Sequence, residues 1–252
     1  KNMCVPFGKI LRGKVVPNTV TKTLHTDKVY EPDLNSFTIE PFPYYSPLKS
    51  QIETIKSFDR PVILVDDLVH TANRLQVLVP QLREDGIPIK KVVVGVLSGY
   101  GRDLMQCLKV PVESIYSMPN LRQWFVESTL YPFIGGDTVR REEMKVAGLQ
   151  PSINMILPYA TPRLSGCSRE ALVEFSACCI ENSRDLFQVL EAEYRKMYAK
   201  NLTLSRLSEA VILPLCPDKG SCMEYDENLA ASVYLENDLE TLWRMKEFLI
   251  KG

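Results

Sequence analysis

Two short apolar runs, separated by a segment with helical periodicity, mark the middle of the chain. The runs cover residues 61–65 (P-V-I-L-V) and 91–97 (K-V-V-V-G-V-L), and continuous apolar runs of this length are typical of strands buried on both faces of a parallel sheet. Between them, apolar residues recur at helical spacing, at Leu75, Leu78, Val79 and Leu82. This spacing predicts a helix over residues 73–85, closed by Gly86. A strand, a helix and a second strand predict a βαβ unit, and therefore an α/β fold with a parallel sheet.

The segments before this unit carry weaker patterns. Residues 15–24 are rich in β-branched side chains and predict a strand whose faces alternate from Thr19 on. Residues 37–45 are rich in aromatic residues and proline, which favours a loop or an edge strand. Ser46 followed by Pro47 predicts the start of a short helix that ends near Ser57.

Beyond the second run, residues 112–115 and 124–130 are expected to form further strands, and residues 153–157 form another apolar run. Ser168 then predicts the cap of a long helix that reaches about Lys200. Its expected apolar face consists of Leu172, Phe175, Cys179, Leu186, Leu190, Tyr194 and Met197. A last helix is expected over 237–251, with Asn237 as its cap. We therefore expect an α/β domain over residues 1–165 and a mostly helical region over residues 166–252.

Composition places the chain among ordinary globular proteins. The 252 residues are 45% hydrophobic and 24% charged, with a net charge of −1, which excludes collagen-like, coiled-coil and disordered classes. No overall basic field exists to attract nucleic acid, and no apolar run approaches the roughly 18 residues that span a membrane. The seven cysteines are odd in number and irregularly spaced, which indicates reduced thiols in a cytoplasmic protein.

The most informative residues are two adjacent acids, Asp66 and Asp67, that follow the first apolar run. Ligands of open α/β sheets bind beyond the carboxyl ends of the strands, and the N–H groups at the start of the next helix favour a phosphate. Carboxylates at a strand end can bind sugar hydroxyls directly or through Mg²⁺. An acid pair followed by an anion site therefore fits a ribose 5-phosphate group. The pair could instead only cap the turn after a buried strand.

The stretch over residues 62–75, V-I-L-V-D-D-L-V-H-T-A-N-R-L, resembles the signature of the type I phosphoribosyltransferase family. Matching positions are Asp66, Asp67, Leu68 and Thr71. Three positions depart from the family pattern, because His70 replaces a threonine, Ala72 a glycine and Arg74 a threonine. The resemblance implies that the two acids contact the ribose hydroxyls of phosphoribosyl pyrophosphate, while the following loop surrounds the 5-phosphate and Mg²⁺ serves as cofactor.

Carried over residue by residue, the resemblance implies a ribose-phosphate site made of Asp66, Asp67, His70, Thr71, Ala72, Asn73 and Arg74. Asp66 and Asp67 are also the expected catalytic residues and the expected contacts of Mg²⁺, direct or indirect. Lys22 is expected to meet the pyrophosphate, and Tyr100 to stack on an acceptor. The family's pyrophosphate loop is not recognisable around Gly8 and Gly13, so we expect it either before Lys1 or not at all.

Two functional classes stay open at this point. The first is a Mg²⁺-dependent phosphoribosyltransferase that transfers phosphoribosyl to a nitrogenous base. The second is a non-catalytic module that senses phosphoribosyl pyrophosphate or a nucleotide, or serves assembly, as a homodimer or as part of a longer chain. The intact acid pair favours the enzyme, and the altered loop favours the module. P-loop, Asp-x-Asp and Gly-x-Ser-x-Gly motifs are absent from the positions where other α/β enzymes would need them.

Overall fold

The computed structural model describes residues 1–8, 19–42, 45–140, 150–162, 166–207, 211–214 and 225–251. It confirms the α/β class. The chain forms two compact units, one made of Lys1–Lys28 and Thr38–Trp124, the other of Val29–Phe37 and Phe125–Gly252. The boundary expected at residue 165 lies inside the second unit.

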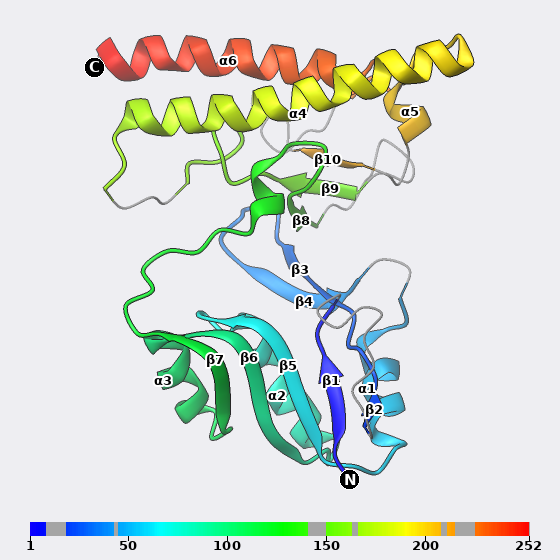
Figure 1. The fold of residues 1–252 in the computed structure, drawn as a ribbon, viewed down its shortest axis with the longest axis vertical. Coiled ribbons are helices and arrows are strands. Elements are labelled where there is room, and N and C mark those ends of the chain that lie inside the picture. The colour runs from blue at the N-terminus through cyan, green and yellow to red at the C-terminus, as the bar shows by residue number, and fades with distance from the viewer. Residues whose placement is uncertain are drawn as a thin grey trace. The chain divides into compact units, whose positions relative to one another are not determined.

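The first unit contains the predicted parallel sheet, with five strands in the order β2-β1-β5-β6-β7 (Figure 1). The strands are β1 (Met3–Pro6), β2 (Val20–Thr21), β5 (Val62–Val69), β6 (Ile89–Ser98) and β7 (Val112–Met118). Every pairing between neighbours is parallel. Strand β5 extends four residues beyond the predicted run, because its pairing with β6 continues to Val69 opposite Leu97. The acid pair therefore lies within the strand rather than behind it.

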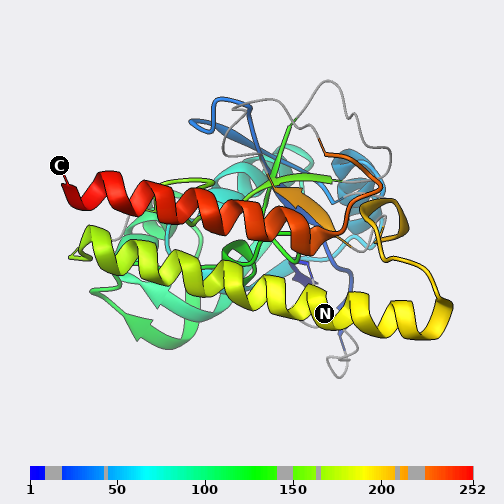
Figure 2. The ribbon, with the colours of Figure 1, turned by 90° about the horizontal axis from the view of Figure 1, so that it is seen from above.

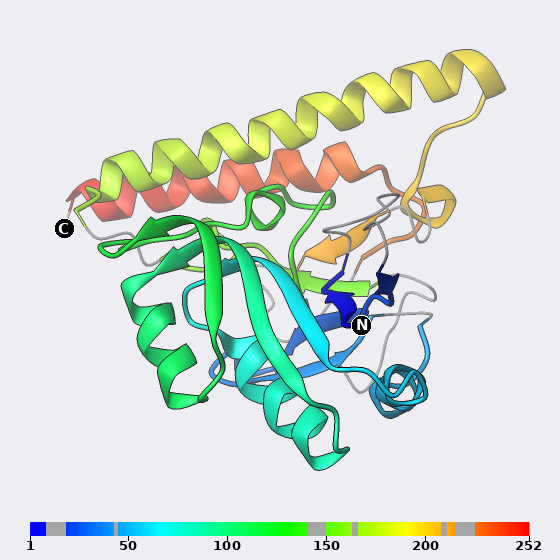
Figure 3. The same cartoon turned by 60° about the horizontal axis from the view of Figure 1, so that its bottom comes forward.

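The helices of this unit follow from their apolar faces. They are α1 (Leu48–Lys56), α2 (Asn73–Glu84) and α3 (Gly99–Cys107), so the helix predicted over 73–85 is confirmed. Both crossovers, β5-α2-β6 and β6-α3-β7, step in the same direction across the sheet, so right-handed connections place α2 and α3 on the same face (Figure 3). The predicted start of α1 is wrong by one residue, because Pro47 rather than Ser46 occupies the cap position.

The strand order changes direction between β1 and β5. From β1 the chain continues to β2 on one side of the sheet, whereas from β5 it continues to β6 and β7 on the other side. Such a switch point leaves a crevice outside the carboxyl ends of the two strands, where α/β proteins bind ligands. Phe7 follows β1 at this point, and its N–H donates to Val65 O at 3.0 Å. The end of β1 therefore lies beside the acid pair.

A second, mixed sheet, which the sequence did not predict, lies partly in the second unit. Its order is β10-β9-β8-β3-β4, with β3 (Thr26–Tyr30), β4 (Phe37–Pro41), β8 (Asp137–Val139), β9 (Gln150–Ile153) and β10 (Ile212–Pro214). Strands β8 and β9 are antiparallel, while β9 and β10 are parallel. The strand predicted over residues 124–130 is wrong, because this segment is a loop followed by the short 3₁₀ helix η1 (Glu127–Leu130). The edge position expected for residues 37–45 is confirmed for β4.

Two long antiparallel helices, α4 (Arg169–Tyr198) and α6 (Ala231–Lys251), complete this unit together with the short α5 (Leu204–Leu207) (Figures 1 and 2). Ser168 caps α4 as predicted, since its side chain accepts the N–H of Ala171 at 3.1 Å. The predicted start of the last helix is wrong, because α6 begins at Ala231 rather than after Asn237. The carboxylate of Glu191 on α4 accepts the backbone N–H and the hydroxyl of Ser232, at 3.2 and 2.6 Å. A side chain of α4 therefore accepts hydrogen bonds from the first turn of α6.

The apolar face predicted for α4 is largely wrong. Four of its members are exposed, namely Phe175, Leu186, Leu190 and Met197. The face that is buried consists of Val173, Ser176, Ala177, Cys179, Ile180, Ser183 and Phe187. Small serine and alanine side chains allow close packing, but a periodicity built on large apolar residues does not count them. No helix in the described ranges is long and apolar enough to cross a membrane, and the five cysteines found there are free thiols.

Close packing of α3 on β5 gives a test of this fold. A Cβ on Gly101, in the first turn of α3, would lie 2.2 Å from the carbonyl oxygen of Val69. Gly101→Ala should therefore lower the free energy of unfolding by about 1–3 kcal/mol, although alanine is the better helix former by about 1 kcal/mol. Urea unfolding measures the change, with Gln106→Ala on the exposed side of α3 as control. An unchanged or raised stability of Gly101→Ala would contradict this packing.

Candidate functional site

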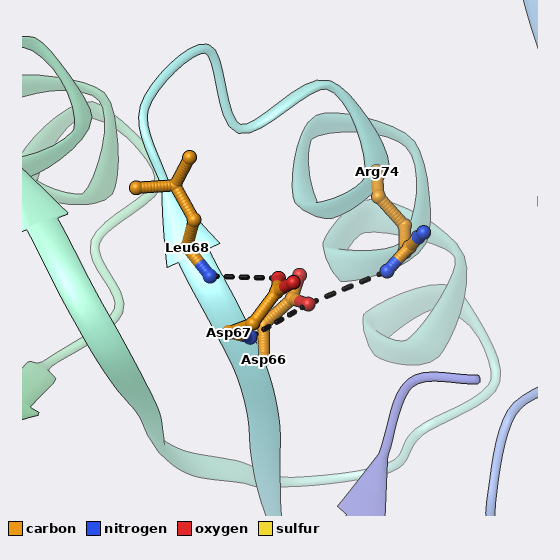
Figure 4. A network of polar contacts seen from close by, with 4 residues as sticks. All are labelled: Asp66, Asp67, Leu68 and Arg74. Atoms are coloured by element: carbon orange, nitrogen blue, oxygen red, sulfur yellow. Dashed lines mark hydrogen bonds and ion pairs between the residues drawn. The ribbon is translucent and has the colours of Figure 1, made fainter. Parts of the chain in front are cut away.

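The two acids occupy different environments within β5. Asp66 is 7% exposed, whereas Asp67 is exposed. Each carboxylate is fixed by the next backbone N–H: Asp67 N–H donates to Asp66 Oδ1 at 3.1 Å, and Leu68 N–H donates to Asp67 Oδ1 at 2.7 Å (Figure 4). Opposite the pair on β6, a Cβ on Gly95 would lie 2.8 Å from Asp67 O. Neighbouring backbone therefore approaches the acid pair closely.

Arg74, in the first turn of α2, points toward Asp66 (Figure 4). Its Nη1 lies 3.4 Å from Asp66 Oδ1, and its guanidinium lies 5.4 Å from the centre of the Phe7 ring. A cation at a helix N-terminus opposes the helix dipole and needs a nearby anion, which Asp66 supplies. The arginine thus connects the ends of β1 and β5 with the start of α2.

Burial raises the pKa of Asp66 from its ordinary value of 3.8 to about 7. The Arg74 cation lowers this pKa, and the neighbouring Asp67 carboxylate raises it again. Near neutral pH, Asp66 therefore exists both as a protonated hydrogen-bond donor and as an ionised acceptor. This mixed character suits hydroxyl groups, which donate and accept in the same way.

The loop between β5 and α2 contains a residue in the left-handed conformation that is not a glycine. Ala72 has φ 52° and ψ 24°, a conformation that costs an ordinary residue about 1–2 kcal/mol. Ala72 therefore forms a left-handed turn at the position where the signature that residues 62–75 resemble has glycine. The Gln76 side chain holds the loop, because its Nε2 donates to Thr71 O at 2.8 Å.

The N-terminus of α2 has no side-chain cap. By contrast, the side chains of Ser98 and Ser168 cap α3 and α4. The first N–H groups of an α-helix have no partner within the helix, and the helix dipole favours an anion at this end. The start of α2, at Asn73, can therefore receive an anionic ligand group.

His70 and Tyr100 lie at the neighbouring carboxyl ends of β5 and β6. His70 Nδ1 lies 2.8 Å from Ser98 Oγ, and the rings of His70 and Tyr100 meet edge to face with their centres 6.1 Å apart. Tyr100 is 57% exposed, whereas Ser98 is fully buried. Ser98, at the end of β6, thus contacts His70 and caps the helix that carries Tyr100.

The predicted residues therefore form two groups joined by the loop over residues 71–73. Asp66, Asp67 and Arg74 form one group, and His70 and Tyr100 form the other. Lys22 lies elsewhere: its N–H donates to Cys4 O, and Cys4 pairs with Ile63, three residues before Asp66. Within the described ranges, no ion pair joins Lys22 to the acids. Of the two glycines considered for a pyrophosphate loop, Gly8 follows β1, and Gly13 lies outside the described residues.

Phe7, Gln76 and Ser98 were not predicted as site residues from the sequence. A serine that follows a strand and precedes a helix is a standard cap pattern, so Ser98 carried a usable signal. Phe7 carried none, because its contact with Arg74 depends on β1 lying next to β5.

The two acids alone offer too few oxygens to complete the coordination shell of Mg²⁺. In the part of the chain that the structure describes, no three or more His, Cys, Asp or Glu side chains gather into a metal site. Mg²⁺ often binds one or two carboxylates and completes its shell with water and substrate phosphates. Asp66 and Asp67 fit this shared arrangement.

The chain matches no model of a known protein family, and its sequence matches no curated protein.

Titration of Asp66 gives a test with a definite sign. A carboxyl group whose pKa rises on folding stabilises the protein below its unfolded pKa, and this contribution is lost as pH rises toward the folded pKa. Between about pH 4 and pH 7, the free energy of unfolding of the wild type should therefore fall relative to that of Asp66→Asn, by on the order of 2–4 kcal/mol. Urea unfolding at a series of pH values measures the difference.

A second variant tests the opposing effect of Arg74. Arg74→Gln removes the cation that lowers the Asp66 pKa, so the pH-dependent loss of stability should extend above about pH 7. Stability profiles of wild type and Asp66→Asn that stay parallel over the whole range would contradict the burial of this carboxyl group.

Proposed function

We propose that the first unit binds a ribose 5-phosphate group, as found in phosphoribosyl pyrophosphate or a nucleotide. The observation that carries the proposal is the placement of Asp66 and Asp67 at the switch point of a parallel sheet, directly before an uncapped helix N-terminus. Sugar hydroxyls and phosphate need these two kinds of partner at opposite ends of one small ligand. The resemblance of residues 62–75 to the type I phosphoribosyltransferases supports the same ligand.

The acids would bind the ribose diol. Asp67 is exposed and oriented by the Leu68 N–H, so its carboxylate can accept a ribose hydroxyl. Asp66 is held between a backbone N–H and Arg74. Its raised pKa of about 7 lets it donate to one hydroxyl oxygen or accept one hydroxyl hydrogen. With one hydroxyl partner for each acid, the site can bind a diol in preference to a ligand with a single hydroxyl group.

The start of α2 would bind the phosphate. N–H groups of the first turn point along the helix axis toward a ligand, and the dipole favours negative charge there. Ala72 in its left-handed conformation sets the direction of this turn, and Gln76 holds it through the Thr71 carbonyl. Arg74 adds a positive charge next to the same turn.

Phosphoribosyl transfer is the reaction that this ligand and the family resemblance suggest. Mg²⁺, held jointly by the acids and the ligand, would screen the charge of the departing pyrophosphate. The chain's own residues would fix the ribose through the acids and the 5-phosphate through the α2 N-terminus, so that a base approaches the sugar in a defined direction. Positioning of this kind, together with screening of charge, would supply most of the rate.

Binding without turnover is the second candidate function. The ion pair between Arg74 and Asp66 favours this second function, because it occupies one acid of the pair. Arg74 stands at a position where the family signature has a threonine. A sensor needs selective binding rather than catalysis, and selective binding is favoured when Asp66 is already held in place before the ligand binds.

Calorimetric titration with ribose 5-phosphate and with phosphoribosyl pyrophosphate, each with and without Mg²⁺, tests the proposal. We expect saturable binding that Asp67→Asn weakens by about tenfold or more, since hydrogen bonds to charged groups contribute about 1.5–3 kcal/mol. Asp67 is exposed, so this variant should keep the fold. Asp103→Asn, at an exposed carboxylate of α3, is the matched control and should bind like the wild type.

Release of pyrophosphate in the presence of nitrogenous bases then separates the two functions. Turnover that Asp67→Asn abolishes supports the transferase, and saturable binding without turnover supports the sensor. A folded protein that binds neither ligand would overturn the proposal.

A further inference from the structure

Ser98 is a fully buried hydroxyl that joins two structural roles. Its Oγ accepts the N–H of Gly101 at 2.9 Å, which caps α3, and it lies 2.8 Å from Nδ1 of His70. A serine hydroxyl carries one hydrogen and accepts through two lone pairs. In the bond between Ser98 and His70, either the hydroxyl or the ring nitrogen can be the donor.

The hydrogens available to the two groups determine which of them donates. Gly101 N–H already donates to Ser98 Oγ. If His70 Nδ1 also donated, the hydroxyl hydrogen would be buried with no acceptor among the contacts of the described residues, at a cost of about 1–3 kcal/mol. The hydroxyl therefore donates to Nδ1. In the neutral ring, the remaining hydrogen must then be carried by Nε2.

We propose that Ser98 is a positioning residue that fixes His70 in the Nε2–H form, so that the imidazole donates to an anionic oxygen of a ligand. His70 directly precedes the loop to α2, and its ring contacts the Tyr100 ring edge to face, which limits its rotation. A directed N–H donor next to an uncapped helix N-terminus enlarges the anion site with one more hydrogen bond. In naming the 5-phosphate as the anionic group, this inference rests on the proposed function.

Long-range ¹H–¹⁵N correlation spectra of the free protein test the tautomer without any ligand. The chain has only two histidines, so a His70→Gln variant assigns the signals. We expect the neutral ring of His70 to show Nε2 as the protonated nitrogen and Nδ1 as the unprotonated one. A wild-type spectrum dominated by the Nδ1–H form would overturn the proposal.

Ser98→Ala tests the positioning role. This variant should give a mixture of tautomers and bind ribose 5-phosphate about three- to tenfold more weakly, the loss expected for one hydrogen bond. In a His70→Gln background, the same change should leave the affinity unaltered. Equal losses in both backgrounds would show that Ser98 acts only through the cap of α3, and would overturn the positioning role.

Inorganic phosphate, used beside ribose 5-phosphate, separates this inference from the proposed function. Weaker binding of both ligands to Ser98→Ala places the donor at the phosphate. Loss of binding restricted to ribose 5-phosphate would contradict this placement. An Nε2–H form in a protein that binds neither ligand would overturn the proposed function and the ligand role of His70, while the tautomer would stand. If Ser98→Ala fails to fold, the wild-type spectrum still tests the tautomer of His70. Weaker binding of ribose 5-phosphate to His70→Gln then tests the ligand role of His70.

Discussion

Burying Asp66 near the end of a central strand costs desolvation free energy, and the structure around it is arranged to offset part of that cost. The neighbouring N–H and Arg74 both favour the ionised form, yet burial is the larger effect and raises the pKa to about 7. Arg74 in turn rests on Phe7. Through Arg74, this poorly solvated carboxyl group links the start of α2 to the ends of β1 and β5, which are held together by their parallel pairing.

This arrangement depends on strand order more than on local sequence. Strand β1 lies next to β5 although about 55 residues separate them along the chain, and only this neighbour brings Phe7 to Arg74. The same order creates the switch point at which a ligand can approach the acids. His70 and Ser98 meet for a related reason, since β5 and β6 pair in register up to Val69 and Leu97. The arrangement is therefore a product of parallel pairing, with the acids near the end of β5, Ser98 at the end of β6 and Arg74 at the start of α2.

The sequence predicted the parts of this fold that local patterns encode. The continuous apolar runs and the helical spacing around Leu78 were sufficient to predict β5, α2 and β6. Strand β1 was not predicted, because its four residues, which include Pro6, carry little periodicity. The mixed sheet was not predicted because its strands of three to five residues pair over long sequence distances. On α4, serine and alanine at the buried positions misled a prediction based on large side chains.

A crystal structure with ribose 5-phosphate is the most direct test of the central claim, because it locates both ends of the ligand at once. The account predicts the ribose hydroxyls within hydrogen-bond distance of Asp66 and Asp67, and the phosphate at the first turn of α2 beside His70. A ligand bound at another place, or one with its phosphate at the acid pair and its hydroxyls at α2, would contradict the account.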